Sequence, residues 1–164
     1  MRIRSDRTYR FDVTPEAFWD ASSGVEQYRS WWPWLRSFDA TALAAGQVWS
    51  CMVQPPLPYA LRFDLMLDEV VAPSLVRATV TGDIVGRATL GIEAIDGGCA
   101  IRLRSALSPR NDILRLAAAV ARPIVRFGHD WVLDTGARQF GDRALPPEEP
   151  RPRRTGSRAT PTGP

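Results

Sequence analysis

The fold is decided by the stretch IVGRATLGIEAIDGGCAIRLRSAL at residues 84–107. On each side of Asp96-Gly97-Gly98, apolar or small residues take alternate positions, and polar residues, Arg87, Thr89, Glu93, Arg102 and Arg104, lie between them. Alternation with a period of two is typical of a strand with one buried face, and Asp-Gly is a hairpin signal. The stretch therefore predicts two antiparallel strands, each with one covered face.

Outward from this hairpin, the same alternation recurs along the chain. Further strands are predicted at residues 3–13, 37–43, 47–53, 59–71 and 75–81. Between the first two of them, the sequence predicts two short helices, one started by Thr14-Pro15-Glu16 and one over residues 25–31.

The C-terminal part of the chain has a helical pattern. From Asp112 to Phe140 apolar residues gather on one side of a helix and arginines on the other, with a kink expected at Pro123. The element order is one strand, two helices, six strands and one long helix. It predicts an α+β domain in which an antiparallel sheet of about seven strands wraps the last helix.

Charge and composition narrow the class of protein. The 164 residues include 21 arginines and no lysine; residues 1–141 carry 16 arginines against 15 acidic residues. Such a nearly neutral body lacks the basic face of a nucleic-acid-binding domain. No signal peptide and no run of about 20 apolar residues is found, which favours a cytoplasmic protein without stable membrane insertion. Oligomeric state is left open.

The end of the chain differs in composition from the rest. Residues 142–164 are rich in proline and arginine and hold almost no apolar side chain that could build a core. The sequence predicts a folded domain over residues 1–141 and a disordered tail over 142–164.

The residues that usually bind metals or cofactors are sparse. Cys51 and Cys99 lie in separate predicted strands, which favours two buried free thiols over a disulfide framework. Together with the single histidine, His129, they give no zinc spacing, and no phosphate-binding glycine loop is found. The sequence predicts neither a metal nor a cofactor.

Three motifs resemble a known superfamily: YRSWWPW at residues 28–34, GDIVGRA at 82–88, and ARP at 121–123 followed by RFGHD at 126–130. With the element order, they resemble the START-like or SRPBCC superfamily, whose fold is called the helix-grip. The likeness spans residues 2–140 and is strongest to the polyketide cyclase/dehydrase and lipid-transport group. It implies a cavity between the sheet and the last helix that holds an apolar molecule, such as a lipid, polyketide or quinone.

Candidate residues for the wall of that cavity lie on the predicted inner faces. Small residues there, Ala78, Gly86 and Ala88 on strands with Ala117, Ala121 and Gly128 on the helix, either leave room for a ligand or let helix and sheet pack closely. The large candidates for ligand binding are Trp49, Phe63, Leu65, Leu90, Leu103, Ile124 and Trp131.

Two aromatic or proline-rich segments are candidates for the rim of the cavity. Trp31-Trp32-Pro33-Trp34 forms either an aromatic gate, a membrane-docking point or a packed corner beside the sheet. The loop from Gln54 to Tyr59 is a second candidate for the rim.

His129 is the candidate catalytic base because Asp130 and Asp134 follow it closely. Its helical angle, counted along one continuous helix, places it at the boundary between the inner and polar sides, where it would be partly solvated. Arg7 shares strand parity with Tyr9 and Phe11, so it either points inward toward a ligand carboxylate or snorkels at the sheet edge.

Three functions remain open on these observations. The first is a protein that carries or sequesters an apolar small molecule. The second is a cyclase or dehydratase that acts on a polyketide-like substrate in the same cavity, with His129 moving protons. The third is a partner-binding module that uses the tryptophan-rich corner.

Overall fold

The computed structural model describes residues 2–110 and 112–145. Its strands are β1 (Ile3–Phe11), β2 (Leu35–Asp39), β3 (Val48–Val53), β4 (Leu61–Val71), β5 (Leu75–Gly82), β6 (Ile84–Ile95) and β7 (Gly98–Pro109). Its helices are α1 (Pro15–Ser22), the 3₁₀ turn η1 (Val25–Gln27), α2 (Tyr28–Trp31), α3 (Asp112–Val120) and α4 (Arg122–Arg143).

All seven strands form one antiparallel sheet in the order β1-β7-β6-β5-β4-β3-β2. The predicted hairpin of residues 84–107 forms the second and third strands of this order: β6 and β7 pair along their whole length, with Ile92 opposite Ile101. Gly97 makes the turn with a φ of +80°, which glycine adopts readily. The predicted α+β class and the sheet of about seven strands are confirmed.

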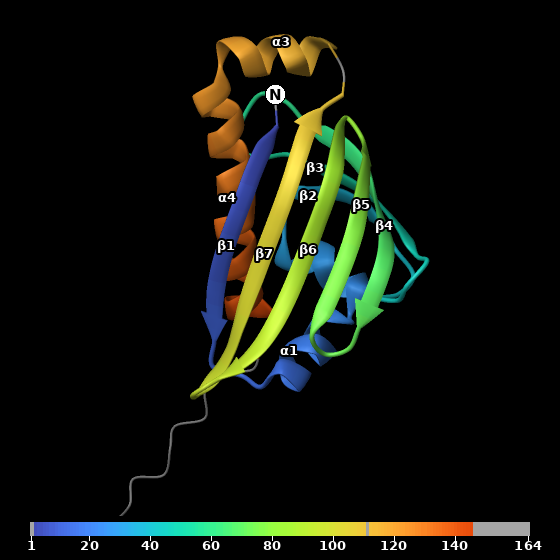
Figure 1. Cartoon of the computed structure of the whole chain (residues 1–164), viewed down its shortest axis with the longest axis vertical. Helices are drawn as coiled ribbons and strands as arrows, with labels where there is room; N and C mark the ends of the chain where they lie inside the picture. Colours follow the sequence, from blue (N-terminus) through green and yellow to red (C-terminus); the bar gives the residue numbers. More distant parts are fainter. Residues whose placement is uncertain (1, 111, 146–164) are drawn as a thin grey trace, which may run out of the picture.

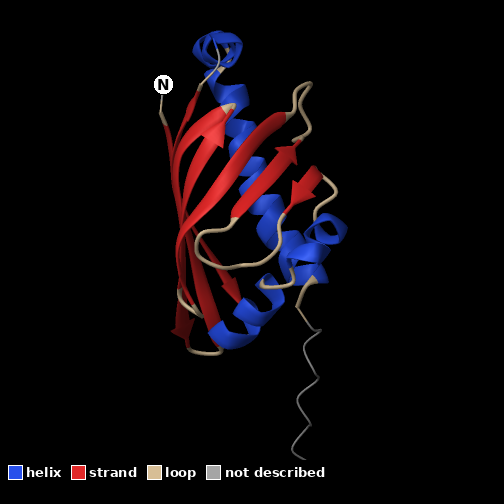
Figure 2. Cartoon of the chain, turned by 90° about the vertical axis from the view of Figure 1, so that its right-hand side faces the viewer, coloured by secondary structure: helices blue, strands red, loops and turns tan. Residues whose placement is uncertain are grey.

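The sheet curls around α4, which runs along its concave side (Figures 1 and 2). Near its C-terminal end, α4 is held by an aromatic cluster in which Phe140 contacts Phe18 and Trp31, with ring centroids 4.8 Å and 5.4 Å apart. The long C-terminal helix wrapped by the sheet is therefore confirmed.

The expected single kinked helix is instead two helices. α3 ends at Val120 and α4 begins at Arg122, with Ala121 outside helical geometry between them. Pro123 has no N–H to continue the hydrogen-bond ladder of α3, but it suits the first turn of a new helix. As a result, α3 crosses the end of the molecule at a steep angle to α4 (Figure 1).

The boundary predicted after residue 141 also shifts slightly. Asp142 and Arg143 belong to α4, because the helix continues to Arg143. The rest of the predicted tail, residues 146–164, lies outside the described residues, as do the side chains of Ile113, Ala117 and Ala118.

Burial on the inner face of the sheet differs between its two ends. Leu67, Ile92 and Ile101, toward the α1 end, are 2–5% exposed. Two positions nearer α3 on the same strands and the same face, Leu65, Leu90 and Leu103 are only half-buried. On β4, β6 and β7 the inner face is therefore covered more completely toward the α1 end, whereas Val80 on β5 stays 3% exposed near the α3 end.

Three general properties follow from the described residues. Cys51 and Cys99 are buried free thiols, as predicted. No described helix combines the length and apolar character needed to cross a bilayer. Within residues 2–110 and 112–145, histidine, cysteine and acidic side chains form no group that could hold a metal ion.

Candidate functional site

The strand residues predicted to line a cavity lie on the inner face of the sheet. Phe63, Leu65, Leu90 and Leu103 are half-buried there. Trp49 is more completely enclosed, at 8% exposure, and its indole N–H donates to the carbonyl of Ala42 at 2.9 Å. Trp49 is thus a core residue, whereas the other four keep surface that a ligand could cover.

The small residues expected nearby are used for close packing at two positions. A Cβ at Gly86 would stand 2.0 Å from the carbonyl oxygen of Ala106, so this glycine lets β6 and β7 approach. A Cβ at Gly128 would stand 2.8 Å from the Leu57 side chain and 3.0 Å from the Tyr59 hydroxyl. The lack of a side chain at Gly128 therefore lets the loop between β3 and β4 pack closely against α4.

The two wall candidates on α4 lie away from the inner sheet face. Ile124 is 49% exposed. Trp131 is half-buried and lines a groove on the flank of the helix. The expectation that both face the sheet assumed one continuous helix from Asp112; because α4 starts anew at Arg122, the helical phase differs.

The groove beside Trp131 has a volume of about 500 Å³. It lies between α4, the segment that leads into β2, and the loop between β3 and β4. Its lining consists mainly of aromatic and proline residues: Pro33, Trp34, Arg36, Gln54, Pro55, Pro56, Leu57, Pro58 and Trp131. We call it the Trp131 groove. It brings together the two predicted rim segments and one predicted wall residue.

The tryptophan-rich segment is fastened to α4. Trp31 is 5% exposed, Trp32 donates its indole N–H to the carbonyl of Gly136 at 3.0 Å, and Trp34 donates to Oε1 of Gln139 at 2.9 Å. Of the alternatives considered for this segment, the packed corner describes it best. Of this segment, Pro33 and Trp34 also line the groove.

A second hollow of about 570 Å³ lies on the outer side of the sheet. Its lining includes Ser50, Met52, Arg62 and Asp64 of the outer face of β3 and β4. The neighbouring residues Cys51 and Phe63, whose strand parity is that of the inner face, also line it, so Phe63 is the one predicted strand wall residue that lines a hollow. Leu65, Leu90 and Leu103 line neither of the two hollows.

Polar side chains from β1, β7 and α4 form a cluster where the helix meets the β1 edge of the sheet. Arg7 binds Asp130 at 3.0 Å and Asp134 at 3.4 Å. The Tyr9 hydroxyl donates to Asp134 at 2.6 Å. Arg7 is therefore neither a free inward cation nor a snorkelling edge residue, since it joins β1 to α4.

His129 lies on the sheet side of the same cluster. Its Nε2 is 3.3 Å from the hydroxyl of Ser105, and its Nδ1 is 3.4 Å from Oδ1 of Asp130. The side chain is 17% exposed, so His129 is a partly buried residue, in agreement with the boundary position expected for it.

The environment of the cluster shifts its acid–base properties. Burial lowers the pKa of His129, and the nearby Asp130 carboxylate opposes that shift only in part. His129 is therefore a neutral imidazole at pH 7. Burial and the hydrogen bond to Asp134 raise the pKa of Tyr9, which stays protonated.

Sequence reasoning missed Ser105 and Ser5. On β7 the inner positions Cys99, Ile101, Leu103 and Leu107 are apolar, and the interruption of that series at Ser105 is the signal that was available. Ser5 lies opposite Ser105 in the β1–β7 register. Its hydroxyl is buried and makes no hydrogen bond with any described residue.

Known structures share this architecture. No protein-family model matches the chain, and no curated protein matches its sequence. Among solved structures, TTHA0849 from Thermus thermophilus superposes with a TM-score of 0.71 at 12% identity, covering 88% of this chain and 97% of that protein.

Two further neighbours have named activities or pathways. The di-domain ARO/CYC BexL of the BE-7585A biosynthetic pathway matches with a TM-score of 0.71 at 14% identity, over 91% of this chain and 51% of its own. Norcoclaurine synthase from Thalictrum flavum, solved with dopamine and hydroxybenzaldehyde, matches with a TM-score of 0.59 at 9% identity, over 87% and 88%. The curled antiparallel sheet, the long helix on its concave side and these superpositions together show that the chain has the helix-grip fold of the START-like, or SRPBCC, superfamily.

Proposed function

We propose that this protein binds an apolar small molecule, such as a lipid, polyketide or quinone, between the sheet and α4, and acts in the cytoplasm as its carrier or store. The observation that carries the proposal is the burial gradient on the inner face. Leu65, Leu90 and Leu103 keep exposed apolar surface toward the α3 end, while Leu67, Ile92 and Ile101 on the same strands are 2–5% exposed. A bound apolar molecule would remove that surface from water.

The Trp131 groove supports the same proposal as a route of entry. Its volume of about 500 Å³ falls within the range of about 300–1,000 Å³ that is typical of small-molecule sites. Its aromatic and proline side chains offer rigid apolar contact at little entropic cost. The fold is shared with norcoclaurine synthase, which has been solved with two small aromatic molecules.

The polar groups near the inner face restrict the ligand further. The Ser5 hydroxyl is buried and unsatisfied among the described residues; Ser105 lies opposite Ser5 on β7, and the Ser105 hydroxyl is 3.3 Å from His129. A buried hydroxyl without a partner is costly unless some group satisfies it. We therefore propose that the ligand is apolar over most of its surface and carries one hydrogen-bonding group, such as a carbonyl or hydroxyl.

A substitution pair on β6 tests where the ligand binds. Ala88→Phe adds a ring to the inner face of the sheet. Thr89→Phe adds the same ring one residue later, on the outer face of the sheet. We expect Ala88→Phe to weaken binding of the apolar dye N-phenylnaphthylamine by about tenfold or more, and Thr89→Phe to leave it unchanged. Dye fluorescence in titration measures both, and unchanged binding in Ala88→Phe would contradict the proposed place.

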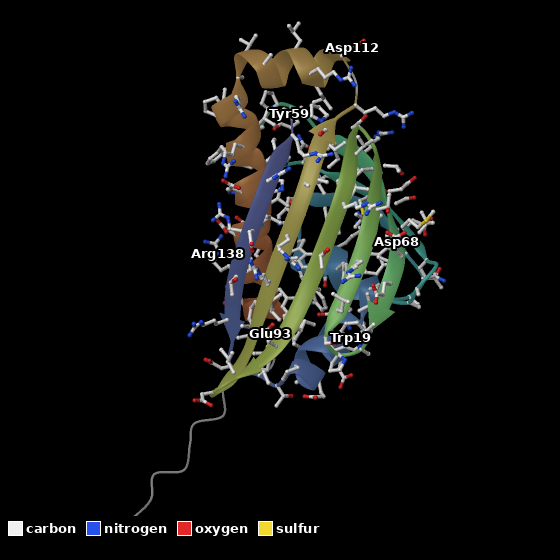
Figure 3. All side chains as sticks on the ribbon, in the orientation of Figure 1. Trp19, Tyr59, Asp68, Glu93, Asp112 and Arg138 are labelled. Atoms are coloured by element: carbon white, nitrogen blue, oxygen red, sulfur yellow. The ribbon has the colours of Figure 1, made fainter. Side chains whose placement is uncertain are left out.

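A second pair tests the groove. Trp131→Ala should weaken dye binding. The control is Trp19→Ala, which should leave dye binding unchanged because Trp19 is a half-buried residue of α1 at the other end of the molecule (Figure 3). Native mass spectrometry of the purified protein would identify a co-purified molecule directly. A chain free of any small molecule that also fails to bind the dye would refute the proposal.

One observation favours a second function, a cyclase or dehydratase that uses the same space. His129 is neutral, faces the sheet, and lies between Ser105 and Asp130. A neutral imidazole can accept a proton from a carbon next to a carbonyl and return it to a departing hydroxyl. Once a substrate is found, His129→Ala should abolish turnover while dye affinity stays unchanged; unchanged turnover removes His129 from the mechanism.

A further inference from the structure

The corner where α3 meets α4 exposes four large apolar side chains. Leu116 and Val120 on α3 are 69% and 81% exposed, and Ile124 and Phe127 on α4 are 49% and 53% exposed. We call these four residues the apolar corner. Grouped exposure of this kind, unlike a single exposed leucine, marks an interaction surface.

The spacing gives each helix one apolar face. Leu116 and Val120 are four residues apart on α3, and Ile124 and Phe127 are three apart on α4, so each pair shares a face. Trp131 follows Phe127 by four residues and lines the Trp131 groove. The apolar face of α4 therefore leads from the corner directly to the groove.

The corner carries a net positive charge. Residues 110–129 contain four arginines, Arg110, Arg115, Arg122 and Arg126, and one acidic residue, Asp112. In the rest of residues 1–141, acidic residues outnumber arginines, 14 against 12. All four arginines are exposed; Arg115 forms an exposed ion pair with Asp112 at 3.6 Å, and Arg126 one with Asp130 at 3.7 Å. Positive charge is thus concentrated beside the exposed apolar side chains.

We propose that the apolar corner docks on an anionic lipid bilayer. Leucine, isoleucine and phenylalanine side chains enter the interface, and Arg115 and Arg122 meet lipid phosphates; this is the composition of helices that lie in the plane of a membrane surface. α3 has nine residues, less than half of a membrane span, so the docking is peripheral. A second copy of this chain is a poorer occupant, because a symmetric contact would bring the arginines of both corners together.

Docking in this way would place the Trp131 groove next to the acyl chains, from which an apolar molecule could enter. The docking itself needs no ligand, so it stands or falls independently of the proposed function. Dye binding measured without lipid tests the proposed ligand binding, and vesicle binding measured without dye tests the proposed membrane docking.

The experiment is co-sedimentation of the full chain with vesicles of phosphatidylcholine, with and without phosphatidylglycerol. We expect binding to the mixed vesicles only, weakened by salt because the charges are screened. The double variant Leu116→Ser, Phe127→Ser should bind at least about tenfold more weakly. Arg122→Glu should weaken binding in the same direction.

The matched control is Val48→Ser, Met66→Ser. These two residues are 47% and 50% exposed and lie opposite each other on β3 and β4, so the control removes comparable apolar surface from the sheet. It should bind mixed vesicles like the unmodified chain. Failure of the unmodified chain to bind, or an equal loss in both double variants, would overturn the proposal. So would a dimer detected by light scattering that the corner variant abolishes.

Discussion

At the scale of single residues, the Gly82-Asp83 motif and Gly86 fix the corner between β5 and β6. Gly82 and Gly86 have φ angles of +125° and +153°, which other residues rarely adopt. The carboxylate of Asp83 accepts a hydrogen bond from the backbone N–H of Arg62 at 2.8 Å. The likeness of this motif to other helix-grip proteins thus has a backbone explanation that requires no ligand.

Gly86→Ala should therefore destabilise the protein strongly. The added Cβ meets a backbone carbonyl that cannot move aside, and we expect a loss of about 2–4 kcal/mol. Gly91→Ala on the same strand is the control, because a Cβ there has nothing within 4 Å. It should be neutral or stabilise by less than about 1 kcal/mol. Urea unfolding of both variants checks the contrast.

His129 should make stability depend on pH. Burial lowers its folded-state pKa below the ordinary 6.5, so below that pH the unfolded chain binds a proton more readily than the folded one. The contribution of the neutral imidazole is complete above about pH 6.5 and is lost as pH falls through the lowered pKa. The facing groups are Asp130, Arg126 and Arg7.

His129→Gln lacks this titration. The free energy of unfolding of the unmodified protein, minus that of the variant, should therefore decrease between pH 8 and pH 5. Urea unfolding at several pH values measures it. Two parallel curves would show that His129 titrates alike in the folded and unfolded states.

At the scale of elements, the C-terminal half of α4 packs into the core through an aromatic side chain. Phe140 lies between the rings of Phe11, Phe18 and Trp31 at 5% exposure. Phe127, thirteen residues earlier on the same helix, is 53% exposed and belongs to the apolar corner. The same residue type on one helix thus has a structural position and a surface position.

Phe140→Ala should cost about 3–5 kcal/mol of unfolding free energy, since it leaves a cavity in the aromatic cluster. Phe127→Ala should cost much less, about 1 kcal/mol or below, because about half of the residue is exposed and it leaves no enclosed cavity. Thermal unfolding followed by circular dichroism compares them. Similar losses would mean that the α3 end of α4 packs more tightly than its exposure indicates.

At the scale of the whole molecule, strand residues were predictable and helix residues were less so. The alternation along a strand is local, so Phe63, Leu65, Leu90 and Leu103 were assigned to the inner face from a few neighbours each. The side on which Ile124 and Trp131 lie depends on the phase of α4, which the break at Ala121 resets. Pro123 was recognised, but a proline permits either a kink or a new helix, and packing decides which.

The candidate site needed contacts that no local pattern contains. Arg7 and Asp134 are 127 positions apart in the chain, and Ser5 meets Ser105 only because β1 pairs with β7. The groove similarly combines a loop, a helix and an interstrand segment. The sequence predicted the residue types and the element on which each lies, whereas the topology of the sheet determines which of these residues are in contact.

The rate at which the buried thiols react can report how often the folded protein opens. Burial raises the pKa of Cys51 to about 12, and Cys99 has no exposed surface, so neither offers a reactive thiolate in the native state. An alkylating reagent should consequently modify Cys99 only as fast as the sheet opens, whereas Cys51, at 9% exposure beside the outer hollow, is held back by its raised pKa. Mass spectrometry of the labelled chain would time that opening without any introduced probe.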